Sequence, residues 1–213
     1  PHGRVTEHIK RGLRGHSSVE YVHLLASPRF LETSYELAEE LEVFGYEVNV
    51  HEISAFELRS VVDTIVSIAK QHQGEDLYIN ITGGTNLMAG AATSSAFFIG
   101  ARPYYVLEPQ EDESIDELVV SLPAPRQPLT FDLSDPQREV LEQLGEWDVN
   151  GREGVIGREI GEVLGESAQN ISYHVGQLEE RGLVETHPTG RRKEIVLTDV
   201  GRLYLRWTGG KAG

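Results

Sequence analysis

The 213-residue chain contains no cysteine, which excludes disulfides, thiolate metal sites and cysteine nucleophiles. It also has no apolar run near the roughly 20 residues that span a bilayer, and no signal peptide is visible. We therefore expect a soluble, cytoplasmic protein without a membrane partner.

Positive charge is scarce as well. The chain has 34 acidic residues against 19 basic ones, only four of which are lysines, and its net charge is -15. An acidic, lysine-poor surface remains hydrated in concentrated salt, where charge repulsion is screened within about 3 Å at 1 M. This composition favours a halophilic, archaeal-type cytoplasm, and an ordinary acidic protein is the alternative.

Several catalytic motifs are absent. The sequence has no G-x-x-x-x-G-K-[ST] loop, no G-x-G-x-x-G after a strand, no G-x-S-x-G elbow and no H-E-x-x-H pair. We therefore expect no cofactor, no metal and no assigned catalytic residue. His23 and His51 lie in predicted strands, and we interpret them as structural.

The amino-terminal half alternates strand-like runs with helical patterns. This order predicts βαβ units and therefore an α/β fold, a Rossmann-like, doubly wound, mostly parallel sheet. The predicted strands are residues 19–26, 47–53, 77–82, 102–108 and 117–123, and the predicted helices are 30–44, 55–70 and 86–99.

The amino end departs from this pattern. A short helix is predicted over residues 6–13, preceded by a turn at Pro1 to Arg4, whereas a doubly wound sheet usually begins with a strand. We expect that this first strand is missing through truncation or disorder; a fold that begins with a helix is the alternative.

Four prolines between residues 122 and 136 interrupt regular structure and predict a linker. The predicted organisation is a ligand-sensing and dimerisation domain over 1–123, a linker over 124–133 and a DNA-binding domain over 134–213. Ser134 is the expected N-cap of the next helix, with Pro136 in its first turn. The order that follows, three helices, a two-stranded hairpin and a closing helix, is typical of a winged helix-turn-helix.

The segment SAQNISYHVGQLEERG has the pattern of a recognition helix. Ile171, Val175 and Leu178 are spaced to face a core, which leaves polar side chains free for base edges and phosphates. The hairpin tip carries the densest cationic cluster of the chain, suited to phosphate or minor-groove contacts. The predicted DNA-binding residues are Ser167, Gln169, Asn170, Ser172, Tyr173, Gln177, Arg191, Arg192 and Lys193.

In the amino-terminal half, the stretch LYINITGGTN predicts a strand, a Gly-Gly turn and a helix amino terminus. Such an arrangement presents bare backbone amides and suits a phosphate, although Thr85 as the N-cap of an ordinary turn is the alternative. In a parallel sheet, ligands bind beyond the carboxyl ends of the strands. Ser27 ends the first visible strand and could form a further wall.

Two resemblances follow from these residues. The string from SAQNISYHVGQLEERGLVE through GRRKEIVLTDVG resembles the ArsR and MarR-like winged helices of prokaryotic transcription regulators, which implies double-stranded DNA as a partner. A protein-protein or dimerisation module is the alternative.

The strand followed by T-G-G-T-N, a small-residue helix and a winged helix resembles the CRISPR-associated Rossmann-fold (CARF) regulators. That resemblance implies a homodimer that binds a cyclic oligoadenylate with the loop after the first strand and the GGT-type loop. The residues it implies are His2, Gly3, Arg4, Thr82, Gly83, Gly84, Thr85 and Asn86. Many members have lysine where this chain has Asn86.

We therefore expect a ligand-responsive transcription regulator that is not an enzyme. One alternative is a metal-independent ring nuclease that cleaves the cyclic ligand, with Arg4, Thr85 or His2 assisting in-line attack. Another is a regulator of the same architecture, outside CRISPR immunity, that senses a different anion.

Overall fold

The computed structural model describes residues 3–16, 18–108, 118–124, 131–152, 154–190 and 192–209. The chain divides into an amino-terminal unit, residues 1–129, and a carboxyl-terminal unit, residues 130–213. Within the described ranges, no helix is both long and apolar enough to cross a membrane.

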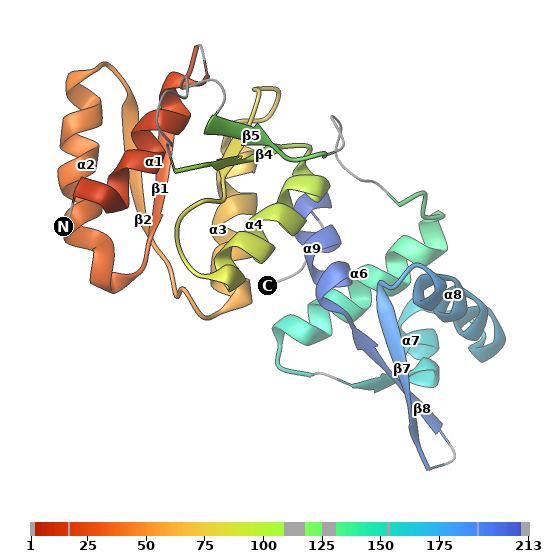
Figure 1. Ribbon diagram of the computed structural model, residues 1–213. Helices are drawn as coiled ribbons and strands as arrows, with labels where there is room; N and C mark the ends of the chain where they lie inside the picture. Colours follow the sequence, from red (N-terminus) through yellow and green to blue (C-terminus); the bar gives the residue numbers. More distant parts are fainter. Residues whose placement is uncertain are drawn as a thin grey trace. The chain divides into compact units, whose positions relative to one another are not determined.

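The amino-terminal unit is a mixed α/β structure (Figure 1). Its elements are α1 (Gly3–Arg14), β1 (Tyr21–Ala26), the 3-10 turn η1 (Pro28–Phe30), α2 (Leu31–Val43), β2 (Glu47–Glu52), α3 (Leu58–Gln71), β3 (Tyr78–Asn80), α4 (Asn86–Ile99), β4 (Arg102–Val106) and β5 (Val119–Ser121). The predicted alternation of strands and helices is confirmed, and α4 has the predicted bounds.

The single doubly wound sheet is not observed. Instead, the described strands form two sheets: β1 pairs with β2 in parallel, and β3 pairs with β4 in parallel, with β5 antiparallel at the far edge. The pattern of apolar residues predicts where strands form, but it does not show which strands share backbone hydrogen bonds. For this reason the sequence did not reveal that β1 and β3 lie in different sheets.

The amino end also differs from its predicted turn. Gly3 and Arg4 form the first residues of α1. The helix extends to them because Ile9 and Leu13 pack on a cluster formed by Val22, Leu24 and α2, and nothing in the preceding residues breaks the period. Pro1 and His2 lie outside the described residues.

Helix ends follow the capping residues seen in the sequence. The Thr85 hydroxyl accepts a hydrogen bond from the Met88 amide at the start of α4, and Gly100 closes that helix in the left-handed conformation, with φ of 73°. Gly45 adopts φ of 94° two residues after α2, as expected of a glycine that ends a helix.

The carboxyl-terminal unit contains α6 (Asp135–Val149), β6 (Val155–Ile156), α7 (Gly157–Leu164), α8 (Ala168–Glu180), β7 (Val184–Thr189), β8 (Arg192–Leu197) and α9 (Asp199–Thr208). Ser134 is the N-cap of α6, and its backbone amide donates to Gln137 Oε1 at 3.0 Å. The two-residue strand β6 was not predicted; it pairs with β8, so the wing is a three-stranded sheet in the order β6-β8-β7.

One apolar core holds this unit together. Leu141, Ile160, Ile171 and Leu183 are fully buried in it, together with residues from every helix and from all three strands. Leu133, predicted to lie in the linker, belongs to this core. Arg202 of α9 adds a bidentate ion pair with Asp148 of α6, at 2.9 and 2.7 Å.

Candidate functional site

The predicted Gly-Gly turn joins β3 to α4. The Thr85 hydroxyl makes two hydrogen bonds: it donates to the Ala55 carbonyl at 3.0 Å and accepts from the Met88 amide at 3.2 Å. The Thr82 hydroxyl accepts from the Val106 amide at 2.7 Å. Both hydroxyls therefore help to fix the turn, and the Thr85 hydroxyl already has both a donor and an acceptor partner.

Asn80 connects this turn to α1. Its side-chain oxygen accepts from the Thr82 amide at 3.0 Å, and its side-chain nitrogen donates to the His8 carbonyl at 3.3 Å. The first amides of α4, those of Asn86 and Leu87, have no acceptor within the helix, and the helix dipole adds positive potential there. The result is a rigid, amide-rich loop at the carboxyl end of β3.

Glycine is required at one of the two positions. Gly84 has φ of +86°, where any Cβ is strained, and a Cβ there would also lie 2.8 Å from Met88 Sδ. A Cβ on Gly83 would lie 2.6 Å from His8 Nε2, so a side chain there would push the His8 ring aside.

A cavity of about 1240 Å³ opens beside the turn. Its wall includes Ser27, Gly83, Gly84, Thr85 and His8, so α1 and two strand ends converge there. Of the predicted ligand-binding residues, Thr82 and the exposed Asn86 do not line this cavity, Gly3 and Arg4 start α1, and His2 lies outside the described residues.

His8 is a site residue that the sequence analysis missed. Burial, with a smaller contribution from Arg11, lowers the pKa of His8 below its usual value, so the ring is neutral at neutral pH and offers a hydrogen-bond donor or acceptor. No motif around His8 marks it in the sequence. Its contact with Gly83 forms only when α1 packs against the turn.

Three histidines form a second polar cluster, and two of them, His23 and His72, line the same cavity. His23 Nδ1 lies 2.9 Å from His51 Nε2, His23 Nε2 lies 3.0 Å from His72 Nε2, and His72 Nδ1 lies 3.0 Å from Glu75 Oε2. If all three rings are neutral, His51 donates to His23, His23 donates to His72 and His72 donates to Glu75, so each contact is a hydrogen bond. Burial and then the neighbouring His51 and His72 lower the pKa of His23 to about 4.

These histidines serve the packing of β1, β2 and α3, which supports the structural interpretation. Among the described residues, no group of three or more His, Asp or Glu is arranged to hold a metal ion.

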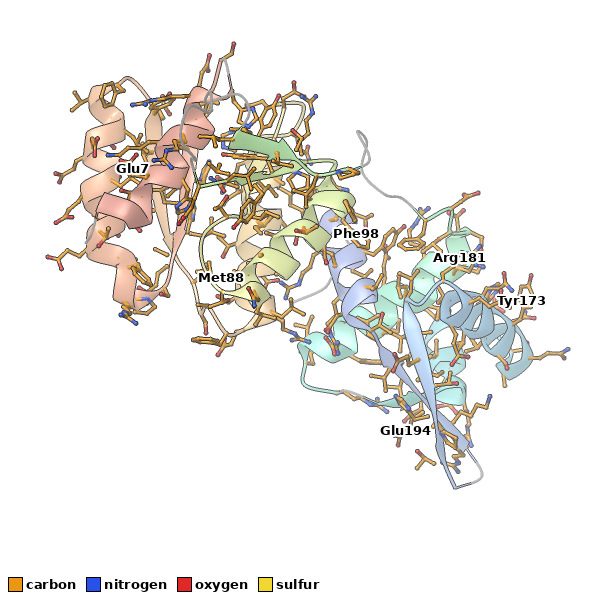
Figure 2. All side chains as sticks on the ribbon, viewed as in Figure 1. Glu7, Met88, Phe98, Tyr173, Arg181 and Glu194 are labelled. Atoms are coloured by element: carbon orange, nitrogen blue, oxygen red, sulfur yellow. The ribbon has the colours of Figure 1, made fainter. Side chains whose placement is uncertain are left out.

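In the carboxyl-terminal unit, α8 has two different faces. Ile171, Val175 and Leu178 are buried, as their spacing predicted. The Ser167 hydroxyl accepts from the Asn170 amide at 3.2 Å, which confirms the predicted N-cap. The residues that remain accessible are Gln169, Asn170, Ser172 and Tyr173, and Tyr173 points outward from the helix with 64% of its surface exposed (Figure 2).

Two of the predicted reading residues already have partners. Asn170 Nδ2 donates to Glu166 Oε2 at 2.9 Å. Gln177 is partly buried, and its side chain lies between Glu180 and Arg181. This contact occupies one N–H of the Asn170 amide and leaves its second N–H and its oxygen for a base.

The wing brings its cations together at its tip. Thr189 pairs with Arg192 across the hairpin, and Gly190 has φ of +64°, as a tight turn requires. Arg192 and Lys193 are exposed, and Arg191 lies outside the described residues. Arg158 of α7, which is not among the predicted residues, exposes 76% of its side chain and pairs with Glu162 at 2.7 Å.

The carboxyl-terminal part is a MarR-family winged helix, since the model of that family matches residues 131–193. A family model described as HFX_2341_N:-like, N-terminal matches residues 1–112, more than half of the chain. The chain therefore belongs to this family. A search of curated proteins gives no match.

Similar solved structures align with about a third of the chain. They include a probable transcriptional regulator from Pseudomonas aeruginosa, with 26% identity over 37% of this chain and 58% of that one, at a TM-score of 0.33. The PcaV regulator from Streptomyces coelicolor has 29% identity over 38% of this chain and 57% of its own, at 0.32. MepR from Staphylococcus aureus has 26% identity over 37% and 58%, at 0.32. The chain thus spans less than three fifths of the length of these proteins.

Proposed function

We propose that this protein is a ligand-responsive transcription regulator whose carboxyl-terminal unit binds double-stranded DNA. The observation that carries the proposal is the exposed polar face of α8 on a MarR-family winged helix, next to a hairpin whose tip presents Arg192 and Lys193. A helix with a buried apolar stripe and a free polar stripe can enter a major groove, while a cationic hairpin follows the phosphates.

The acidic composition sets a condition on this binding. With a net charge of -15, long-range forces repel DNA, so the few cations at the interface must act at short range. High salt screens the long-range repulsion within a few ångströms and also weakens each phosphate contact. We therefore expect a weaker loss of affinity with salt than a basic winged helix would have.

DNA binding is tested by selecting bound duplexes from a random-sequence library. A two-fold symmetric regulator would enrich a palindromic site with half-sites separated by a turn of the duplex, about 34–36 Å. Enrichment of no sequence, together with retention no better than that of serum albumin, would reject DNA binding and leave a protein-protein module.

The amino-terminal unit is proposed to sense an anionic, nucleotide-like ligand, with a cyclic oligoadenylate as the first candidate. Its support is the pinned Gly83-Gly84 turn, whose amides lie at the mouth of a large cavity beside His8 and Ser27. The parallel pairs β1–β2 and β3–β4 further support a Rossmann-like arrangement, in which ligands bind at this edge.

A homodimer is part of the same proposal. Two apolar residues near the turn are exposed: Phe56 exposes 82% of its surface, and Leu87 exposes 39%. The hydrogen bond from the Thr85 hydroxyl to the Ala55 carbonyl brings the segment with Phe56 next to the segment with Leu87. The face of α4 with Gly90 and Ser94 is also exposed, and small side chains permit close helix approach.

Ligand binding is tested by titrating cyclic tetra- and hexa-adenylate and following the melting temperature, with linear hexa-adenylate as control. Ligand present at 100 times its Kd raises the free energy of unfolding by about 2.7 kcal/mol. No shift with either cyclic ligand would reject this ligand class. Conversion of the cyclic ligand to a linear product would instead support the ring nuclease.

A further inference from the structure

The helix α8 carries no positively charged side chain. Its sequence, Ala168–Glu180, includes no lysine or arginine, and the uncharged polar side chains exposed on it are Gln169, Asn170, Ser172 and Tyr173. A bidentate arginine contact to guanine is therefore not available from this helix, whereas a side-chain amide can pair with adenine at two points. Base readout by α8 thus favours A·T base pairs.

Of the two exposed amides, Asn170 is the better placed to read a base. It lies in the first turn of α8, where its backbone amide donates to the N-cap Ser167 Oγ at 3.2 Å, and the next residue, Ile171, is fully buried. Residues near the amino end of a recognition helix are those that contact base edges. Its side chain is also shorter than that of Gln169, so ordering it costs less conformational entropy.

Glu166, the residue before the N-cap, is held from below by α7. Its backbone amide donates to the Gly161 carbonyl at 3.0 Å, and a Cβ on Gly161 would lie 2.6 Å from the Glu166 carbonyl oxygen. The loop therefore packs directly on the α7 backbone. From this fixed position, Glu166 Oε2 accepts from Asn170 Nδ2 at 2.9 Å across the first turn of α8.

The Glu166 carboxylate decides which way the Asn170 amide faces. A carboxylate only accepts hydrogen bonds, so it attracts Nδ2, whereas an amide turned by 180° would place Oδ1 against it as a second acceptor. The second N–H and the oxygen of Asn170 therefore keep one fixed order. Adenine presents the complementary pair in the major groove, an N7 acceptor beside an N6 donor.

We propose that Asn170 reads an adenine in the major groove and that Glu166 is a positioning residue, which fixes the orientation of the Asn170 amide. This inference rests on the proposed DNA binding and names the base that the helix selects. Glu166 has an opposing effect on affinity, because an exposed carboxylate near phosphates repels every duplex alike. The residue therefore improves discrimination between bases while it weakens binding to DNA of any sequence.

The test compares the duplexes selected by the full chain, by Glu166→Gln and by Asn170→Ala. Glutamine has the shape of glutamate but can donate as well as accept, so it permits both orientations of the Asn170 amide. At one position of the selected site, we expect an adenine preference of about tenfold or more for the unchanged chain, about threefold or less for Glu166→Gln and none for Asn170→Ala. Affinity for random-sequence DNA should rise in Glu166→Gln.

The matched control is Glu162→Gln on α7, which removes the same charge from an exposed residue whose partner is Arg158. It should leave the adenine preference unchanged. The inference is overturned if Glu166→Gln keeps the full preference, if Glu162→Gln loses as much of it, or if Asn170→Ala retains it. If the unchanged chain selects no sequence at all, the proposed DNA binding fails and this inference fails with it, so the two failures are distinguished.

Discussion

The two units of this protein differ in how completely they are closed. In the carboxyl-terminal unit, each helix and strand contributes to one buried cluster, and both tryptophans, Trp147 and Trp207, belong to this unit. In the amino-terminal unit, two small sheets border a cavity of about 1240 Å³. The comparison shows that similar local patterns can produce one shared core in one unit and two separate sheets in the other, because strand pairing depends on contacts between residues that are distant in sequence.

The largest expected effect comes from a glycine in the closed unit. A Cβ on Gly201 of α9 would overlap the Leu183 carbonyl and lie 2.9 Å from Leu197 Cδ1. Because backbone cannot yield as a side chain does, Gly201→Ala should destabilise this unit by about 3 kcal/mol or more. Urea unfolding followed by tryptophan fluorescence measures this unit, and Gly176→Ala on α8, with no atom within 4 Å, is the control. Equal midpoints for the two variants would contradict the tight α9 packing.

Next in size is the effect at the wing. Replacing Arg192 and Lys193 by alanine should reduce DNA affinity by about 10- to 100-fold at 0.1 M salt and lower the salt slope by about 2, because two phosphate contacts are lost. Fluorescence anisotropy with a labelled duplex measures both quantities. Replacing exposed Arg158 instead tests whether α7 also follows the backbone. An unchanged affinity in the wing variant would show that the wing does not contact DNA.

In the open unit, Gly84→Ala should cost about 1–2 kcal/mol, since its φ of +86° strains any Cβ. It should also abolish the thermal response to the cyclic ligand by moving the turn amides. Gly45→Ala is the matched control: Gly45 has φ of +94° and no atom within 4 Å, so it carries the same backbone strain away from the turn and should leave the ligand response unchanged. A ligand response retained by Gly84→Ala would remove the turn from the binding site.

The smallest effect concerns pH. Burial lowers the pKa of His23 to about 4, so the unfolded chain, with a pKa of 6.5, binds the proton more readily. Stability of the amino-terminal unit is therefore complete above pH 6.5 and falls as the pH drops toward 4. We expect a loss of about 1 kcal/mol after allowing for solvent screening at this partly exposed ring. Calorimetry between pH 7.5 and 4.5 measures the loss, and His23→Gln should flatten it; a slope unchanged by that variant would assign the pH dependence to other groups.

The sequence by itself determined the local elements. Periodicity and capping residues located α4 and α8 and placed the N-caps Ser134, Thr85 and Ser167, because these features depend on neighbours within a few residues. The wing was predicted from its turn and its alternation, except for β6, whose two residues are too few to produce a pattern.

Only the tertiary structure decided what these elements meet. His8 reaches Gly83, and His23, His51 and His72 join in one chain, through contacts between residues far apart in sequence. The Thr82 and Thr85 hydroxyls, candidates for a ligand from their motif, bond within the protein: Thr82 accepts from the Val106 amide and Thr85 donates to the Ala55 carbonyl. The pairing of β1 with β2 and of β3 with β4 has the same origin: strand propensity is a property of each segment, whereas pairing depends on which edges the folded chain brings together.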